Sequence, residues 1–343
     1  MKVHYKKFTL DFKRPSGTSR GVLRQKETYF IEIVDGNQKG VGECGLFRGL
    51  SHDDVPDFEE QLAAVCVALQ KGKSTAALCT DFPSIQMGVE MALLSFHAAS
   101  PFQLFDTTFS RGTQSIPING LIRMGDLAFM REQVFEKIHA GFDCIKLKIG
   151  ALDFESECQL LAEIREQYSN DKLTLRVDAN GAFAADEALE KLQRLAVFDL
   201  HSIEQPIDAR QTKALSDLCA VTPLPIALDE ELIGVLEYKA KRKLLDDINP
   251  QYIILKPSLL GGFAASEEWI QLAEERNIGW WVTSALESNV GLNAIAQWTA
   301  SLNTTTAQGL GTGSLFTNNM ESPLVAAQGQ LQYNHALSWD YTF

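Results

Sequence analysis

The stretch CIKLKIG, from Cys144 to Gly150, places two lysines at alternate positions of an otherwise apolar segment. Successive side chains of a β-strand point to opposite faces, so Lys146 and Lys148 share one face of this predicted strand. Later apolar segments also end in polar residues, which recur at intervals of 25–30 residues. The residues that continue the series are Asp178, Glu204, Asp229, Lys256 and Ser284.

That interval fits one strand, one helix and two loops, and amphipathic stretches such as 154–168 do lie between the apolar segments. Eight strand candidates follow one another from Ile116 to Gly311. The pattern predicts an α/β fold, a modified TIM barrel of the type (β/α)7β over residues 116–320. The eighth strand candidate, TAQGLG, lacks a normal following helix.

The first third of the chain has a different pattern. Two β-rich runs are joined by a turn at Asp35-Gly36, and two helical patterns follow them. We therefore expect an α+β capping domain over residues 1–115, and a C-terminal segment, 321–343, that packs back on it. The basic, Gly/Ser-rich stretch Arg14–Glu27 is expected to be a mobile lid loop with Ser19 and Arg20 as substrate contacts, or else an ordinary solvated loop.

Composition narrows the choice of partner. The net charge of −13 argues against a nucleic-acid surface and against binding to anionic membranes. No stretch is apolar for long enough to predict membrane insertion. Six scattered cysteines with no C-x-x-C pair indicate reduced thiols and a cytoplasmic protein. A small-molecule partner is expected, and a homo-oligomer is left open.

The strand-end residues suggest a chemistry, because the carboxyl ends of barrel strands carry the active site. Asp178, Glu204 and Asp229 form an all-oxygen set suited to Mg²⁺, with Mn²⁺ as a substitute. The alternative is a buried ion network in which lysines only neutralise acids. Six such residues at successive strand ends favour a catalytic site instead.

The lysines extend this prediction. A lysine beside a second lysine and a dication has its ammonium form disfavoured, so its pKa is expected to fall and it can act as a base. Lys146 and Lys148 fit that arrangement, and Lys256 would approach from the opposite side. Such a pair could remove a proton α to the carboxylate of a small-molecule substrate. Asn180, Glu230 and Ser284 are expected to bind substrate or support the ligands.

In order and spacing, the segments KLK, VDAN, IEQP, LDE and LKPSLLGG resemble those of the enolase superfamily, muconate-lactonizing subgroup, over nearly the whole chain. The resemblance implies a capping domain and a barrel. It also implies that Asp178, Glu204 and Asp229 are metal ligands, that Lys148 is the acid/base catalyst and that Lys256 is the lysine on the opposite face.

Within that superfamily two branches are disfavoured. No histidine lies between His201 and His335, where mandelate-racemase-like enzymes carry a catalytic one, and the eighth strand lacks the acids of lysine-type dipeptide epimerases. The segments VTSALESNVG and GLGTGSLFTNN resemble the o-succinylbenzoate synthases, dehydratases of menaquinone biosynthesis. An N-acylamino-acid racemase or another cycloisomerase or epimerase of the subgroup is the alternative. A non-catalytic scaffold is disfavoured by the full acid/base set.

Overall fold

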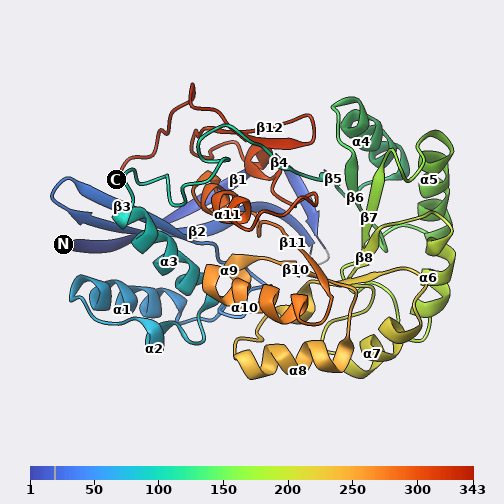
Figure 1. The fold of residues 1–343 in the computed structure, drawn as a ribbon, viewed down its shortest axis with the longest axis horizontal. Coiled ribbons are helices and arrows are strands. Elements are labelled where there is room, and N and C mark those ends of the chain that lie inside the picture. The colour runs from blue at the N-terminus through green and yellow to red at the C-terminus, as the bar shows by residue number, and fades with distance from the viewer. Residues whose placement is uncertain (19–20) are drawn as a thin grey trace.

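The computed structural model describes residues 1–18 and 21–343, which form a capping unit and a barrel unit (Figure 1). Antiparallel strands β1 to β3 and helices α1 to α3 make the capping unit. A curved parallel sheet with helices on its outside makes the barrel unit. Ser19 and Arg20, the expected lid contacts, lie outside the described residues.

The capping sheet has its three strands in chain order, and three helices follow it. The strands are β1 (Lys2–Thr18), β2 (Gly21–Asp35) and β3 (Gln38–Cys44), and the helices are α1 (Phe58–Gln70), α2 (Ala76–Cys79) and α3 (Pro83–His97). Alternation along β2 turns Tyr29, Ile31 and Ile33 into one apolar cluster with residues of α1 and α3. Gly36, with φ +60°, makes the predicted turn between β2 and β3.

The stretch Arg14–Glu27 is not the loop we expected. Its described part belongs to β1 and β2, which pair through Asp11 and Gln25 and, after a register shift, through Ser16 and Leu23. Backbone hydrogen bonds hold such a hairpin, so its Gly/Ser-rich, basic composition did not reveal it. The prediction of a loop was wrong for these residues.

Helix α3 lies so close to β3 that only glycine fits at their contact. A Cβ on Gly42 would stand 2.0 Å from the carbonyl oxygen of Gly88 and 2.5 Å from the backbone nitrogen of Ala92. Both neighbours are backbone atoms of α3, so neither can move aside without shifting the helix.

We therefore expect Gly42→Ala to lower the free energy of unfolding by about 3 kcal/mol, measured by urea denaturation. Gly72→Ala is the control. Its Cβ would meet nothing within 4 Å, so only the left-handed backbone at φ +65° opposes it, at about 1 kcal/mol. Equal losses in the two variants would contradict the packing argument.

Seven parallel strands form the barrel sheet, again in chain order. They are β5 (Gly120–Ile122), β6 (Cys144–Lys148), β7 (Thr174–Asp178), β8 (Ser202–Glu204), β9 (Ile226–Leu228), β10 (Tyr252–Leu255) and β11 (Gly279–Val282). The long helices after them are α4 (Leu127–His139), α5 (Phe154–Gln167), α6 (Ala188–Ala196), α7 (Thr212–Val221), α8 (Tyr238–Ile248), α10 (Gly262–Glu274) and α11 (Asn289–Ser301). The predicted α/β barrel with an N-terminal α+β cap is confirmed.

The eighth strand position departs from the prediction in detail. TAQGLG forms no named strand, but two single bridges, Gln308 to Ile118 and Gly309 to Thr283, stand in its place. Gln308 donates its backbone N–H to Pro117 (2.8 Å), and Gly309 donates to Val282 (2.8 Å). This segment therefore joins the first and last parts of the barrel sheet. Its small, Gly-containing sequence leaves few residues to extend a ladder.

The C-terminal segment makes a small second sheet and then reaches the capping unit. Strand β12 (Leu324–Ala327) pairs with β13 (Gln330–Tyr333), which in turn pairs with β4 (Ile116–Pro117). Further on, the hydroxyl of Tyr341 donates to Oε1 of Glu32 on β2 at 2.6 Å. The ring of Tyr341 also lies 5.6 Å, centroid to centroid, from that of Phe30.

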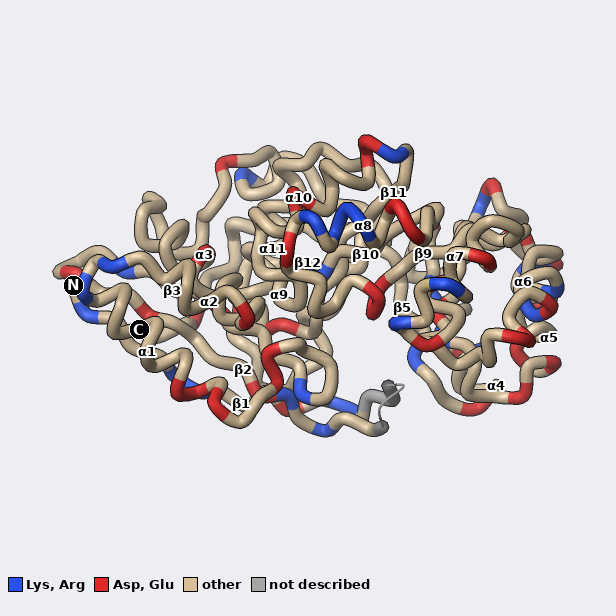
Figure 2. Tube along the Cα trace, turned by 90° about the horizontal axis from the view of Figure 1, so that it is seen from below, with Lys and Arg blue, Asp and Glu red and all other residues tan. Residues whose placement is uncertain are grey.

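Charged residues of both signs lie along the outer helices, including α5 and α6 (Figure 2). One example joins two helices, where Arg194 donates to both carboxylate oxygens of Glu155 (2.5 and 2.6 Å). Such exposed pairs keep a helix surface solvated and add little stability. Among the described helices, none combines the length and the apolar character needed to cross a bilayer.

Candidate active site

The residues predicted to act together lie on neighbouring strands at one end of the barrel sheet. Lys148 on β6 pairs in register with Asp178 on β7, and Asp178 pairs in register with Glu204 on β8. Asp229 directly follows β9, and Lys256 directly follows β10. Because parallel strands in register end at the same level, the spacing seen in the sequence becomes one ring of charged groups.

The lysine ammonium groups bind the carboxylates directly. Lys146 Nζ donates to Asp178 Oδ2 (3.0 Å) and to Glu204 Oε2 (2.6 Å), and Lys148 Nζ donates to the same Asp178 oxygen (2.6 Å). On the other side of the acids, Lys256 Nζ donates to Asp229 Oδ2. Three strands, β7 to β9, separate β6 from β10. Lys148 and Lys256 therefore flank the acid set from opposite sides.

The pKa values of the three acids are shifted in different directions, because burial raises them and the lysine charges lower them. Burial acts to raise the pKa of Asp178, but the Lys146 and Lys148 ammonium groups outweigh it and hold that pKa below its usual range. Glu204 has the reverse balance, since burial and the Asp178 charge raise its pKa to about 8. Burial also raises the pKa of Asp229 in spite of Lys256. For Glu204 and Asp229 the effect of burial therefore outweighs that of the lysines, and for Asp178 it does not.

The expected fall in lysine pKa is not what these neighbours produce. Burial acts to lower the pKa of Lys146, but the charges of Asp178 and Glu204 raise it above its usual value. Lys256 is shifted in the same direction by Asp229 and Glu204. The prediction concerned a lysine beside a dication and stays a prediction; the carboxylates by themselves shift the pKa of Lys146 in the other direction.

The donor set suits a hard dication. Glu204 Oε1 and Glu230 Oε2 are buried carboxylate oxygens without a hydrogen-bond partner in residues 1–18 and 21–343. Buried oxygens of this kind are costly unless something positive approaches them. In the described part of the chain, no three His, Cys, Asp or Glu side chains converge closely enough to hold a metal as they stand. Ammonium groups lie between the carboxylates instead, so a bound metal would have to replace some of these contacts.

Asn180 and Glu230 lie beside the ring, as expected of supporting residues. Asn180 Oδ1 accepts from Lys148 Nζ at 2.5 Å, and Asn180 Nδ2 donates to Glu230 Oε1 at 3.0 Å. Asn180 has φ +43°, in the left-handed region that asparagine tolerates better than most residues. The backbone is thus bent so that this amide reaches the acid/base candidate.

Ser284 lies at the end of β11 and is 6 % exposed. Its hydroxyl is 2.7 Å from that of Thr312, which sequence reasoning did not single out. Each of these hydroxyls can donate or accept, so the pair can turn a donor toward a carboxylate in the barrel. Thr312 lies in GLGTGSLF, the segment that resembles the o-succinylbenzoate synthases.

Gln205 is a supporting residue that the sequence did not point to. It follows Glu204 with φ +39°, and its Oε1 accepts from the backbone N–H groups of Asp229 and Glu231, each at 3.3 Å. It therefore ties the end of β8 to the turn that carries Asp229. A glutamine in IEQP has no local signal for this role, because its partners are distant in the chain.

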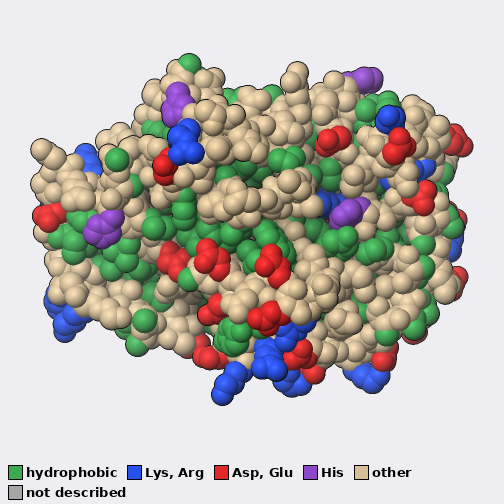
Figure 3. Space-filling model, in the orientation of Figure 1, with side chains coloured by type: hydrophobic (Ala, Val, Ile, Leu, Met, Phe, Trp, Pro, Cys, Tyr) green, Lys and Arg blue, Asp and Glu red, His purple; other side chains and the backbone are tan. Residues whose placement is uncertain are grey.

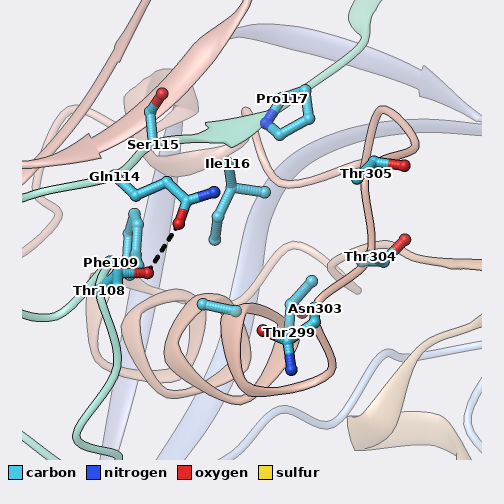
Figure 4. Close-up of a pocket in the computed structure, with 11 residues that line it drawn as sticks. Thr108, Phe109, Gln114, Ser115, Ile116, Pro117, Thr299, Asn303, Thr304 and Thr305 are labelled. Atoms are coloured by element: carbon cyan, nitrogen blue, oxygen red, sulfur yellow. Dashed lines mark hydrogen bonds between the residues drawn. The ribbon is translucent and has the colours of Figure 1, made fainter.

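A cavity of about 260 Å³ lies at a different place, beside β4 and the C-terminal end of α11 (Figure 4). Its polar side chains are uncharged, and two of them, Thr108 and Gln114, bond to each other at 2.9 Å. Acid/base chemistry needs a titratable group, so this cavity is a poorer candidate for the active site than the ring of lysines and carboxylates.

On the face shown in Figure 3, acidic side chains gather over α3, α10 and the short helix α9 (Pro257–Leu260).

Known proteins with similar sequences share this arrangement of cap and barrel. A model of the family described as "Enolase C-terminal domain-like" matches residues 130–336, and a model of "MenC, N-terminal domain" matches residues 5–96. An o-succinylbenzoate synthase of Desulfotalea psychrophila is 46 % identical, over 96 % of this chain and 98 % of that protein.

Solved structures agree with these matches. MenC of Desulfotalea psychrophila has a TM-score of 0.87 at 43 % identity, covering 97 % of this chain and 99 % of that one. A dipeptide epimerase of Enterococcus faecalis, complexed with Mg and the dipeptide L-Leu-L-Tyr, has a TM-score of 0.80 at 19 % identity over 97 % and 96 % of the two chains, and so shares the fold. The chain belongs to the enolase superfamily, in the family that carries the MenC N-terminal domain.

Proposed function

We propose that the protein catalyses the o-succinylbenzoate synthase reaction of menaquinone biosynthesis. This reaction is the syn-dehydration of 2-succinyl-6-hydroxy-2,4-cyclohexadiene-1-carboxylate to o-succinylbenzoate, which makes the enzyme a carbon–oxygen lyase. The observation that carries the proposal is the ring in which Lys148 and Lys256 flank three buried carboxylates. The 46 % identity to an o-succinylbenzoate synthase supports the choice of substrate.

Asp178, Glu204 and Asp229 would hold Mg²⁺, for which Mn²⁺ could substitute. Two features support this assignment: Glu204 Oε1 finds no hydrogen-bond partner among the described residues, and burial with the Asp178 charge raises the pKa of Glu204, which a cation would oppose. The Mg in the dipeptide epimerase of the same fold supports it as well. When bound, the cation supplies positive charge that stabilises the negative charge developing on the substrate's carboxylate. It would also relieve the repulsion among the three acids.

Lys148 is assigned both proton transfers. Its neutral amine removes the ring proton α to the substrate carboxylate, and the electrons of that C–H bond form the new ring double bond. The C–O bond to the ring hydroxyl then breaks, and the resulting Lys148 ammonium gives its proton to the departing oxygen. Water leaves on the face from which the proton was taken, and the ring becomes aromatic.

Lys256 is assigned an electrostatic role rather than a proton transfer. From the opposite side of the ring, its ammonium stabilises the negative charge that spreads over the diene as the proton leaves. The raised pKa that Asp229 and Glu204 impose keeps this group charged against the effect of burial. Lys146, held by Asp178 and Glu204, would set the potential around Lys148.

Asn180, Glu230 and Ser284 are assigned supporting roles. The amide of Asn180 orients Lys148 and is itself oriented by Glu230. Ser284 would donate to a substrate carboxylate with Thr312 as its partner. Ser19 and Arg20 stay proposed as contacts to the succinyl carboxylate.

Racemisation of N-acylamino acids is the second candidate activity, because two lysines on opposite sides could exchange protons with both faces of a substrate. Lys256→Arg separates the two reactions. We expect this substitution to lower the rate of racemisation by about 10³-fold or more, because arginine stays protonated. The rate of dehydration should stay within about 10²-fold of the wild-type rate, because the positive charge remains. Deuterium incorporation from D₂O and loss of the diene chromophore measure the two rates. An equal loss of both activities would contradict the role assigned to Lys256.

The direct test of the proposed function is the loss of the cyclohexadiene chromophore when purified protein meets the substrate, with Mg²⁺ and then with a chelator. Conversion that requires the metal supports the dehydratase. No conversion by folded, Mg²⁺-supplied protein would reject it and make N-acylamino acids the next substrates to try.

We further propose that residues 1–115 form the capping domain, 116–320 the barrel, and 321–343 a segment that returns to the cap. The two family-model matches support the division between cap and barrel, and the bond between Tyr341 and Glu32 supports the return of the C-terminal end to the cap. The cytoplasm is the proposed compartment, on the ground that all six cysteines are buried and free.

A further inference from the structure

A cluster of buried polar side chains lies where the capping sheet meets the barrel, outside the ring of lysines and carboxylates. Lys26 and Glu43 come from β2 and β3, and Ser258, Glu287 and Ser288 follow β10 and β11. Lys26 is 5 % exposed, and the other four are fully enclosed. Charged side chains are seldom buried to this degree unless they are paired, so the cluster requires an explanation.

Glu43 is held by donors from both units. Its Oε1 accepts from Thr28 Oγ1 (2.8 Å) and from the backbone N–H of Ser288 (2.9 Å). Its Oε2 accepts from Ser288 Oγ (2.6 Å) and from the backbone N–H of Gly291 (2.8 Å). Ser288 and Gly291 belong to the N-terminal turn of α11, where the helix dipole favours a negative charge. Glu43 therefore fixes the capping sheet to the start of a barrel helix.

Glu287 holds the loop that carries Ser284. Its Oε1 accepts from Ser258 Oγ (2.6 Å), and its Oε2 accepts from the backbone N–H of Ala285 (2.7 Å). Leu286, which lies between Ala285 and Glu287, has φ +61°, a conformation that bulky side chains rarely adopt. A backbone of this kind persists only when its surroundings hold it. The position of Ser284 therefore depends on Glu287.

Lys26 lacks such contacts, because its Nζ is buried and finds no hydrogen-bond partner in the described part of the chain. Burial lowers the pKa of Lys26, and the charges of Glu43 and Glu287 act against that shift. Those two acids are close together, since a Cβ on Gly291 would lie 2.7 Å from Glu43 Oε2 and 2.8 Å from Glu287 Cβ. Thr28, which is two residues from Lys26 and so on the same face of β2, donates to Glu43, and this places the Lys26 side chain on the face of the sheet that carries the acids.

We propose that Lys26 is a positioning residue for the dehydration: its ammonium balances Glu43 and Glu287 and so holds loop 284–288 and the β1–β2 hairpin together at the barrel mouth. Leu23 of the same hairpin packs with Ala285 and Leu286 of that loop, which gives the two segments a shared apolar contact. Lys26 acts through Glu287 and does not touch substrate. The expected effect on KM rests on the proposed function, whereas the expected effect on the position of loop 284–288 does not.

The test compares Lys26→Met with Lys13→Met, a matched loss of an exposed lysine from the same hairpin. For Lys26→Met we expect KM to rise about tenfold while kcat stays within about threefold, because the loop is misplaced and the reacting groups are intact. Hydrogen exchange of the backbone amides of 284–288 should become about tenfold faster. Lys13→Met should change neither quantity.

A second substitution tests the coupling. Adding Glu287→Gln to Lys26→Met removes the uncompensated charge, so the double variant should lose less than the product of the two single effects. Lys26→Arg, which retains a positive charge, should recover part of the loss in KM.

Several outcomes would overturn the inference: a Lys26→Met protein whose KM and loop exchange match those of Lys13→Met, or single effects that simply multiply. If Lys26→Met does not fold, the test relies on Glu287→Gln alone. In that variant, an unchanged rate of hydrogen exchange at the backbone amides of 284–288 would also contradict the inference. If the wild type does not convert the substrate, the proposed function fails. The exchange measurement still decides the positional role of Lys26 in that case.

Discussion

Lys148→Ala is expected to lower kcat for the dehydration by about 10⁴-fold or more, because one side chain is assigned both the removal of the ring proton and the protonation of the leaving hydroxyl. Lys146 cannot take over, since its ammonium is already held between Asp178 and Glu204. The measurement is the rate of loss of the diene chromophore at saturating substrate and Mg²⁺.

Lys172→Ala, at an exposed position between α5 and β7, is the control and should retain wild-type kcat. Thermal unfolding of both variants checks that the barrel is intact. A Lys148→Ala enzyme that keeps more than about a hundredth of the wild-type kcat would move the acid/base role to another group.

Glu204→Gln is expected to remove Mg²⁺ binding and to lower kcat by about 10³-fold or more. The substitution keeps the shape of the side chain, but it replaces a buried carboxylate, one oxygen of which has no partner, with a neutral amide. A ligand that binds only the folded state raises its stability. Mg²⁺ should therefore raise the Tm of the wild type and leave that of the variant unchanged, and calorimetric titration should show the same contrast.

Glu190→Gln, at an exposed position on α6, is the matched control and should bind Mg²⁺ as the wild type does. Chelator added to the wild type should reproduce the loss of activity caused by Glu204→Gln. If the Glu204→Gln variant gains the same Tm increase from Mg²⁺ as the wild type, then Glu204 is not a ligand, and the proposed site has to be redrawn around Asp178 and Asp229.

Much of the barrel could be predicted because its signals are local. In CIKLKIG the two lysines alternate with apolar residues, and this period of two already puts both ammonium groups on one face of β6. The acids recur at the length of one strand–helix unit, so the parallel register brings Asp178 level with Lys148 and Glu204 level with Asp178. In these cases a residue's place depends on its own strand and on the next one.

The missed features depend on partners far along the chain. The pairing of Gln308 with Ile118 joins segments that are 190 residues apart, and the bonds from Ser288 to Glu43 span 245 residues. The hairpin through Arg14–Glu27 was missed for a related reason, since backbone pairing leaves little mark on composition. The direct contacts of Lys146 with Asp178 and Glu204, which raise its pKa, likewise join residues 32 and 58 positions apart.

The fold class, the order of the strands and the charged residues at their ends could be predicted from short segments, because periodicity and spacing are local properties. Three features depend instead on the folded arrangement of the whole chain: how those charges pair, which backbone turns are held in the left-handed region, and the burial of Lys26 beside Glu43 and Glu287. The physical reason is that electrostatic energy and packing depend on distances in space. Those distances exist only once the capping sheet has closed on the barrel.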